Sequence, residues 1–452
     1  MDSIRYFSTN LKAPAVSFGA ALLQGQAPDR GLYMPDRFPL LEPERLDAFA
    51  ELSYPQIAFE VLHAFLKDEV PADTLRALVN DAYDYDVPLE HVTDEQHVMR
   101  LDQGPTASFK DFAARMMGRL MNYFLGKKNK ELLILTATSG DTGSAIANAF
   151  YGLNNIKVLI LFPEKEVTAR QRKQMTTLGK NVRVIALDSK FDDCQALVKQ
   201  AFSDPELTQM NLSSANSINI GRLLPQSVYY FYAWSQLRRD ISDKPIFVVP
   251  SGNFGDMMGG MIAWKMGLPI DKMLIAVNEN DEFPVFLNTG TYKKIEPSRN
   301  CISSAMNVGH PSNLVRLVSL YDGVMDEKGI IHKMPVMDRM REDMATRSVT
   351  DEETKQCIAE AWKKHELLLE PHGAVGWAAL QHYLKDHKSL AKRLFVVLET
   401  AHPAKFPEQI REILDFDPDL PPSLQGLEEK EEKYDYVSNN YESFKQYLLK
   451  NY

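Results

Sequence analysis

The sequence predicts an α/β protein with open, mostly parallel sheets and a helical region at its N-terminus. Short apolar runs recur along the chain without the polar alternation of half-exposed strands, so we expect each to be buried on both faces, as in a parallel sheet. Stretches with helical periodicity separate these runs, and such alternation is typical of α/β folds. The expected strands are Leu132–Thr136, Lys157–Phe162, Val182–Leu187, Pro245–Val249, Met273–Val277 and Leu394–Leu398.

The region up to about residue 95 has few strand-like runs and is expected to be mostly helical. Prolines punctuate its two periodic stretches, Leu46–Lys67 and Ala72–Tyr83. After Pro422 a charged stretch leads into a final surface helix. Between the strands, further helices are expected at Phe112–Leu125, Thr168–Leu178 and Leu223–Leu237.

Length and composition limit the classes of protein to consider. A chain of 452 residues is expected to form two or three domains. A net charge of -10 argues against a nucleic-acid binder, but it allows a small anionic substrate in a locally positive pocket. We find no apolar run of the roughly 18 residues that a membrane helix needs, and no signal peptide. The 3 cysteines have no disulfide or zinc spacing, so we expect a cytoplasmic protein without a metal.

Three loops that follow expected strands are candidate binding sites, because ligands of open α/β sheets bind at the carboxyl ends of strands. Thr138–Gly143 and Ser251–Asp256 each place glycines before a helix, where backbone N–H groups and the helix dipole favour an anion. Ordinary helix capping explains the first loop equally well. The third loop, Thr400–Phe406, is on its own more simply a polar exit from a strand. Neither a GxGxxG motif nor a Walker loop occurs in the chain.

Lys110 lies at or just before the start of an expected helix, in the segment Gly104–Phe112. The positive end of the helix dipole disfavours a lysine there, and Phe109 and Phe112 flank it, so its amine would lose a proton more easily. A neutral amine is what covalent chemistry with a carbonyl group requires. The alternative is a solvated surface lysine, with Asp111 supplying the favourable charge at the helix start.

Taken together, these segments resemble those of threonine synthases. Gly104–Phe112 resembles the segment that holds the lysine of pyridoxal phosphate (PLP), and Ser139–Gly143 resembles the substrate loop. Ser251–Asp256 resembles the loop for the cofactor phosphate, and Thr400–Phe406 the signature near the C-terminus. The order and approximate spacing match, and Gly31–Pro35 resembles the helical cap of the longer microbial and fungal branch. The resemblance therefore spans nearly the whole chain.

The resemblance implies a fold of the tryptophan-synthase-β type, called fold type II. It divides the chain into a mainly helical N-terminal domain at 1–95 and a large PLP-binding domain at 96–135 and 240–420. A small α/β domain at 136–239 and a C-terminal extension at 421–452 complete the division.

The resemblance also implies roles for individual residues. Lys110 would carry PLP and move protons at the substrate's Cα and Cβ, and Thr400 would hydrogen-bond the pyridine nitrogen. Residues with backbone groups for the cofactor phosphate would be Gly252, Asn253, Phe254 and Gly255, with Asp256 closing that loop. The substrate carboxylate would bind at Ser139, Gly140, Asp141, Thr142 and Gly143. The substrate phosphate would bind at Asn216, Ser217, Asn219 and Arg222.

The implied reaction converts O-phospho-L-homoserine and water into L-threonine and phosphate, with PLP as the electron sink. One alternative is a related phospholyase, which shares this site but releases 2-oxobutyrate. Another is a non-catalytic PLP-binding protein, which the presence of Lys110 and both glycine loops argues against. The sequence leaves open whether the protein is a monomer or a homodimer.

Two carboxylates bring charge close to the implied cofactor. Many fold-type II enzymes have an asparagine where this chain has Asp141, and a carboxylate there would repel the cofactor's phenolate unless it were protonated or turned away. Glu399, beside Thr400, would likewise disturb a neutral environment of the pyridine ring.

Overall fold

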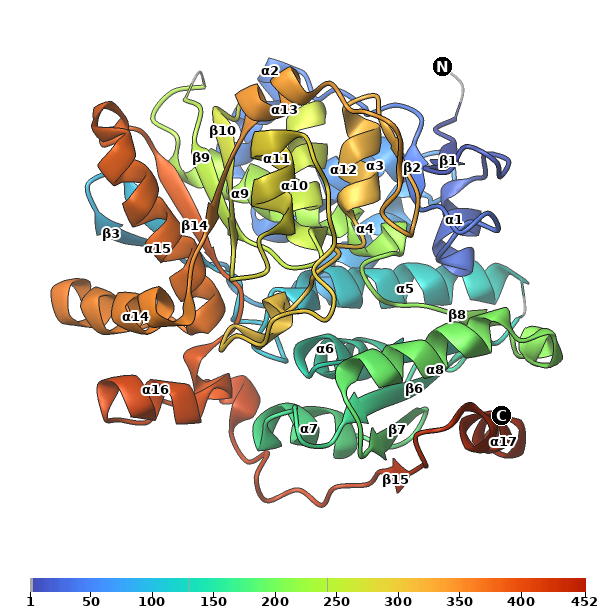
Figure 1. Ribbon diagram of the computed structural model, residues 1–452. Coiled ribbons are helices and arrows are strands. Elements are labelled where there is room, and N and C mark those ends of the chain that lie inside the picture. The colour runs from blue at the N-terminus through green and yellow to red at the C-terminus, as the bar shows by residue number, and fades with distance from the viewer. Residues whose placement is uncertain (1–2, 129, 242) are drawn as a thin grey trace.

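The structure, a computed structural model, describes residues 3–128, 130–241 and 243–452. Two sheets form its framework, and the long helix α5 (Lys110–Lys128) lies between them (Figure 1). In this described part of the chain, no helix combines the length and the apolar character needed to cross a membrane.

The larger sheet has six strands, and all of its pairings are parallel except the one between β3 and β4. Its central strands are buried at every residue, as expected from their almost continuously apolar sequences, and the one charged residue among them is Glu399 at the end of β14. In spatial order the strands are β13 (Met344–Ser348), β10 (Lys272–Val277), β9 (Ile246–Pro250), β14 (Phe395–Glu399), β4 (Gln96–Arg100) and β3 (Leu89–Thr93).

Helices on both faces cover the larger sheet, with α15 packed against β9 and β14. A short hairpin of β11 (Val324–Met325) and β12 (Ile331–Lys333) lies beside α12. The helices are α9 (Val228–Leu237), α10 (Gly255–Lys265), α11 (Glu282–Thr289), α12 (Leu314–Leu320), α13 (Met337–Asp343), α14 (Asp351–His365), α15 (Pro371–Asp386) and α16 (Pro407–Leu414).

The smaller sheet is parallel throughout its five strands. In spatial order they are β15 (Asp435–Tyr436), β7 (Val182–Leu187), β6 (Ile156–Pro163), β5 (Leu132–Ala137) and β8 (Leu212–Ser213), and the helices are α6 (Asp141–Phe150), α7 (Ala169–Thr176) and α8 (Phe191–Ser203). Strand β5 pairs with β6 along its full length, so the whole strand lies in the smaller sheet, across the expected boundary at 135/136. Likewise β3 and β4 join the larger sheet from residue 89, before the expected start at 96.

The N-terminal region is mainly helical, as expected, with one two-stranded sheet of β1 (Tyr6–Ser8) and β2 (Tyr33–Pro35). The periodic stretch Leu46–Lys67 forms more than one helical segment, because Ser53 and Gln56 form a capping box and Pro55 occupies the first turn of a new helix. The helical segments are α1 (Phe18–Gln24), α2 (Pro43–Asp47), η1 (Ala48–Glu51), α3 (Tyr54–Leu66) and α4 (Ala72–Ala82).

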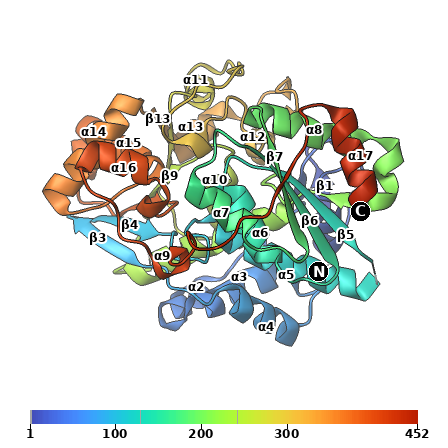
Figure 2. The ribbon, with the colours of Figure 1, turned by 90° about the horizontal axis from the view of Figure 1, so that it is seen from below.

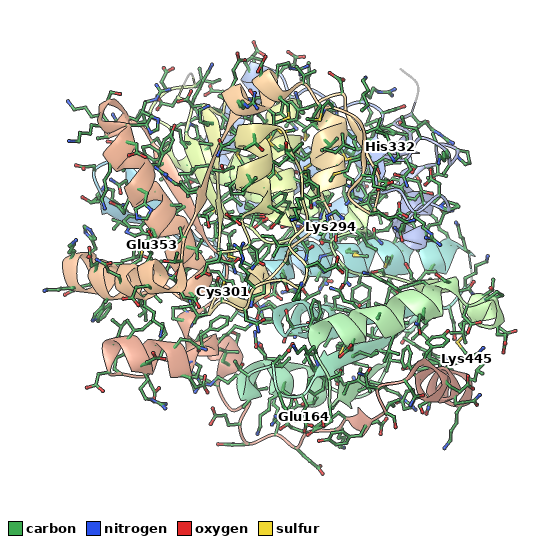
Figure 3. The ribbon with its side chains drawn as sticks, viewed as in Figure 1. Glu164, Lys294, Cys301, His332, Glu353 and Lys445 are labelled. Atoms are coloured by element: carbon green, nitrogen blue, oxygen red, sulfur yellow. The ribbon has the colours of Figure 1, made fainter. Side chains whose placement is uncertain are left out.

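The last thirty or so residues return to the smaller sheet. They run past α7, add β15 beside β7, and finish in α17 (Tyr441–Asn451), which packs on α8 (Figure 2). Lys445 of α17 reaches Asp204 at 2.9 Å, near the C-terminal end of the chain (Figure 3). The remaining 3-10 turns are η2 (Pro205–Met210), η3 (Ile220–Arg222), η4 (Leu224–Ser227), η5 (Ser304–Met306), η6 (Lys388–Leu390), η7 (Pro403–Lys405) and η8 (Pro422–Leu424).

Candidate active site

The segment around Lys110 lies antiparallel to the loop that follows β14. Phe109 N–H donates to the Thr400 carbonyl at 2.9 Å, and His402 N–H donates to the Ala107 carbonyl at 3.0 Å. These bonds bring the start of α5 to the carboxyl end of the larger sheet. Two segments far apart in the sequence, with Lys110 in one and Thr400 in the other, therefore meet at one edge.

A tight turn before α5 fixes the position of Lys110. The buried Asp111 folds back and accepts hydrogen bonds from Thr106 N–H at 2.8 Å and Thr106 Oγ1 at 2.5 Å. Gly104 is required in this turn, since a Cβ there would lie 2.8 Å from the Cβ of Asp111. Asp111 therefore holds the turn that leads into α5, and Lys110 is the residue that faces the site.

Lys110 is not a solvated lysine, because only 13% of its side chain is exposed. Its Nζ lies 3.6 Å from Asp141 Oδ2 and 4.8 Å from the centre of the Phe109 ring. Burial lowers the pKa of Lys110, with Asp141 opposing this change and Lys405 and Arg222 adding to it. The sequence-based expectation of a lysine with a lowered pKa is thereby supported.

The loop after β5 leads into α6 through Gly140, whose φ of 128° only glycine adopts readily. Thr138 Oγ1 accepts the N–H groups of Gly140 and Gly143, at 2.9 and 2.8 Å. Within the described residues, the backbone N–H groups of Ser139, Asp141 and Thr142 make no hydrogen bond to the protein. These free donors at a helix N-terminus suit a carboxylate ligand.

The loop after β9 enters α10 at Phe254, a non-glycine residue with φ 61° and no side-chain cap. Such a conformation is strained, and it is kept here by the buried Phe254 ring packed edge-on against Phe283. Asp256 accepts from Ser251 Oγ and from Met257 N–H at 2.9 Å, which closes the loop. Burial raises the pKa of Asp256 to about 6.

This same loop leaves several donors open toward the site. In the part of the chain that the structure describes, the N–H groups of residues 252–256 donate to no protein acceptor. A Cβ on Gly252 would lie 2.9 Å from the Ala305 carbonyl oxygen, whereas one on Gly255 would make ordinary contacts from 3.4 Å. The loop therefore resembles a cradle for a phosphate group.

The segment Asn216–Arg222 adjoins the cradle, since a Cβ on Gly255 would contact Ser217 at 3.5 Å. Arg222 is buried, its Nη1 donates to the Ala215 carbonyl at 2.7 Å, and its Nε has no partner among the described residues. Asn216 Oδ1 is likewise buried without a described partner. Burial lowers the pKa of Arg222 to about 10.

Asn219 differs from the other expected substrate ligands because its side chain is already engaged. Its Nδ2 donates to the carbonyls of Leu22 and Ser214, at 2.9 and 3.0 Å, and its Oδ1 accepts from Gly221 N–H. The side chain therefore ties the segment to the N-terminal helix α1. This geometry favours a role in shaping the pocket over direct contact with a ligand.

Arg316, on α12, is a buried residue without any local sequence signal that would identify it as functional. Its guanidinium donates to the carbonyls of Tyr33, Ser217 and Ile218 at 2.6–3.1 Å, and to Asn313 Oδ1 at 2.5 Å. Asn313 in turn donates to the Asn253 and Ser217 carbonyls. One buried pair thus connects the two candidate phosphate-binding loops, and it holds a positive charge behind them.

The two carboxyl groups beside the site, those of Asp141 and Glu399, have pKa values shifted in opposite directions. Asp141 forms an ion pair with Lys405, and despite the opposing effect of burial, Lys405 and Lys110 hold its pKa well below the usual range. Burial raises the pKa of Glu399 well above its usual range and Glu370 adds to the shift, whereas Arg100, whose Nη1 lies 3.7 Å from Glu399 Oε1, opposes it. The carboxyl group beside Thr400 therefore holds a proton more readily than a solvated one, whereas the Asp141 carboxylate is paired with Lys405.

Comparisons with known proteins identify three consecutive family regions. A profile for pyridoxal-phosphate dependent enzymes matches residues 89–399. A threonine synthase N-terminus profile matches residues 5–83, and a threonine synthase C-terminal profile matches residues 373–448. Together they account for most of the chain.

Individual relatives and solved structures that resemble this chain are threonine synthases as well. Threonine synthase of Haemophilus influenzae is 38% identical over 98% of this chain and 99% of its own length. The structure of PLP-bound threonine synthase from Brucella melitensis matches with a TM-score of 0.91 at 34% identity, covering 99% of both chains. The structure of threonine synthase from Escherichia coli has a TM-score of 0.88 at 35% identity, covering 99% of this chain and 100% of the other. The expected fold type II is confirmed.

Proposed function

This chain belongs to the threonine synthase family, and from that membership we infer how its residues produce the activity. It converts O-phospho-L-homoserine and water into L-threonine and phosphate, as a PLP-dependent lyase. The observation that carries the residue-level proposal is the convergence of Lys110 with the open N–H donors at the starts of α6 and α10 and with Arg222, whose Nε has no partner among the described residues.

The residues present fit PLP. A buried lysine with a lowered pKa supplies an amine for the cofactor's aldehyde, and the open donors of residues 252–256 supply a cradle for its phosphate. The raised pKa of Glu399 disfavours an anion next to Thr400, which we assign to the pyridine nitrogen. We propose that Lys110, Thr400 and residues 252–256 hold the cofactor.

When bound, PLP supplies an electron sink that stabilises negative charge at carbon atoms of the substrate. We propose that Lys110 takes the proton from Cα, moves protons at Cβ, and returns a proton before release of the product. Desolvation suits Lys110 to this task, because a buried amine gives up its proton at a lower pH than a solvated one.

For the substrate we propose two anchoring points. The open N–H groups of Ser139, Asp141 and Thr142, at the start of α6, bind the carboxylate. Arg222, with Asn216 and Ser217, binds the phosphate, and the buried charge of Arg316 behind the same segment adds to the attraction. Holding both ends fixes Cα and Cβ beside Lys110.

The pocket for the substrate phosphate also governs which product leaves. After the C–O bond at Cγ breaks, a phosphate ion kept by Arg222 and Asn216 orients the water that adds at Cβ. Release before that addition would give 2-oxobutyrate, the product of a phospholyase, and the relatives do not favour that alternative.

We propose that the sheets and the N-terminal helices form separate domains that close around the substrate and exclude bulk water on closure. The protein works in the cytoplasm, as its biosynthetic substrate suggests, either as a monomer or as a homodimer.

Replacement of the reactive lysine tests the proposal. Lys110→Ala is expected to abolish threonine formation and to remove the absorbance of covalently bound cofactor, while a surface change such as Lys388→Ala leaves both intact. Threonine formation at the wild-type rate by the Lys110 variant would refute the assignment.

A further inference from the structure

A second lysine, Lys405, is completely buried beside the reactive one. Its Nζ lies 2.6 Å from Asp141 Oδ1 and donates to the Thr106 carbonyl at 2.8 Å. The other oxygen of the same carboxylate, Oδ2, lies 3.6 Å from Lys110 Nζ. One carboxylate thus stands between two lysines, and one oxygen faces each.

Neighbouring residues hold this arrangement in place. Gln171 of α7 donates to Asp141 Oδ1 at 2.9 Å, on the oxygen that Lys405 also contacts. Arg170, also on α7, donates to the Ala404 carbonyl at 2.5 Å, which fixes the backbone next to Lys405. In Figure 2 the C-terminal chain passes beside α7, where Arg172 pairs with Glu432. The position of Lys405 is therefore determined by several elements.

Burial of Lys405 requires an explanation. An ammonium group inside a protein costs several kcal/mol unless it is paired and hydrogen-bonded, and a methionine or leucine would fill the same space without that cost. Among the described residues, the one ion pair of Lys405 is with the carboxylate that also faces Lys110. The positive charge of Lys405 therefore acts on the carboxylate that faces the reactive amine of Lys110.

We propose that Lys405 is a positioning residue for the reaction: it keeps Asp141 ionised and directed between the two lysines, so that Asp141 compensates Lys110 only in part. The proposal rests on the assignment of Lys110 as the cofactor lysine. Lys405 itself does not touch the reacting atoms in this account. It acts through Asp141 to set how readily the nitrogen of Lys110 gives up its proton.

The charges around Lys110 determine the direction in which its pKa shifts in each variant. Asp141, Lys405, Arg222 and Asp256 face it, and Asp141 raises its pKa whereas Lys405 lowers it. Without Lys405, the negative charge of Asp141 compensates Lys110 alone, so the Lys110 nitrogen keeps its proton to a higher pH. Removal of the charge of Asp141 leaves a second cation nearby, so the nitrogen loses its proton at lower pH. Asp111 and His402 also face Lys405, which lowers the pKa of each, and both residues are retained in every variant.

The test is a pH titration of the visible absorption spectrum of the cofactor-loaded enzyme, whose midpoint reports protonation of the Lys110 nitrogen. Relative to wild type, Lys405→Met is expected to raise the midpoint by about one pH unit or more, and Asp141→Asn to lower it by a similar amount. The double variant, which removes both charges, is expected to return close to the wild-type midpoint. A second readout is the pH at which the cofactor-free protein recaptures PLP, and it should shift in the same directions.

Two controls keep the result interpretable. Lys405→Gln retains polar contacts without the charge, and it replaces the methionine variant if that protein fails to fold. Lys445→Met breaks a lysine–aspartate pair far from the site, at α17, and should leave the midpoint unchanged (Figure 3).

Midpoints that shift in the same direction in both single variants, or that do not shift, would overturn the proposal and leave Lys405 a purely structural residue. That result is distinct from failure of the proposed function. In the latter case the wild-type enzyme would form no threonine, whatever the midpoints.

Discussion

Arg222 provides the most direct test of the substrate pocket. It is buried, no carboxylate within the described residues lies at ion-pair distance from it, and its Nε has no described partner. A buried guanidinium in this state carries an uncompensated positive charge. The substrate is the only dianion that the reaction brings to this loop besides the cofactor. Arg222→Ala should therefore weaken substrate binding.

The size of the effect follows from the interaction that is lost. A hydrogen bond to a charged group contributes about 1.5–3 kcal/mol, and every 1.4 kcal/mol is a tenfold change in affinity. One such contact corresponds to a loss of roughly 10- to 150-fold in affinity for O-phospho-L-homoserine. Cofactor content should stay at the wild-type level, because the open donors for the cofactor phosphate belong to residues 252–256.

Steady-state kinetics with O-phospho-L-homoserine, together with the absorbance of bound PLP, measure both quantities. Arg411→Ala is the matched control, since that arginine is exposed and pairs with Asp417 away from the site. Inhibition by inorganic phosphate should weaken in parallel in the Arg222 variant. An unchanged KM combined with loss of PLP would refute the reasoning, because Arg222 would then belong to the cofactor pocket.

Further changes probe the cradle, a buried carboxyl group and the choice of product. Gly252→Ala should lower both cofactor affinity and melting temperature, because its Cβ would lie 2.9 Å from the Ala305 carbonyl, whereas Gly255→Ala should lower cofactor affinity alone, as measured by PLP titration. Burial raises the pKa of Glu282 to about 8, so the folded state holds the proton more tightly and stability falls as pH rises from about 4.5 to 8. Glu282→Gln should flatten this decline by up to about 1.4 kcal/mol per pH unit in urea unfolding, and an equal slope in both proteins would disprove the assignment. Asn216→Ala should lower the rate and raise the 2-oxobutyrate fraction, and an unchanged fraction would separate this residue from the choice of product.

Much of the fold follows from local sequence. Buried parallel strands are continuously apolar, so β5, β7 and β9 were predicted to within a residue or two. The strands β4 and β13 were missed, because they lie at or next to the edge of their sheet and carry polar residues such as Gln96 and Arg347. Local pattern also cannot assign a strand to a sheet, so the pairing of β5 with β6 could not be read from its sequence.

The site could be predicted only in part, for a similar reason. Lys110 and the glycine loops have local signals, and the structure brings them together. Asn219 has the same local signal as Asn216, yet a contact with the distant Leu22 engages its side chain. Lys405 lies within the segment Thr400–Phe406, but its pairing with Asp141 depends on how η7 is placed beside the start of α6. No periodicity or spacing in the sequence reports such contacts.

The central claim is that the site converts O-phospho-L-homoserine into L-threonine. The measurement that tests it most directly is simultaneous quantification of threonine, 2-oxobutyrate and phosphate after incubation of the PLP-loaded protein with this substrate. We predict one threonine for each phosphate released, with 2-oxobutyrate as a minor product. Phosphate release accompanied mainly by 2-oxobutyrate would contradict the claim, because it would mean that the unsaturated product leaves before water adds at Cβ.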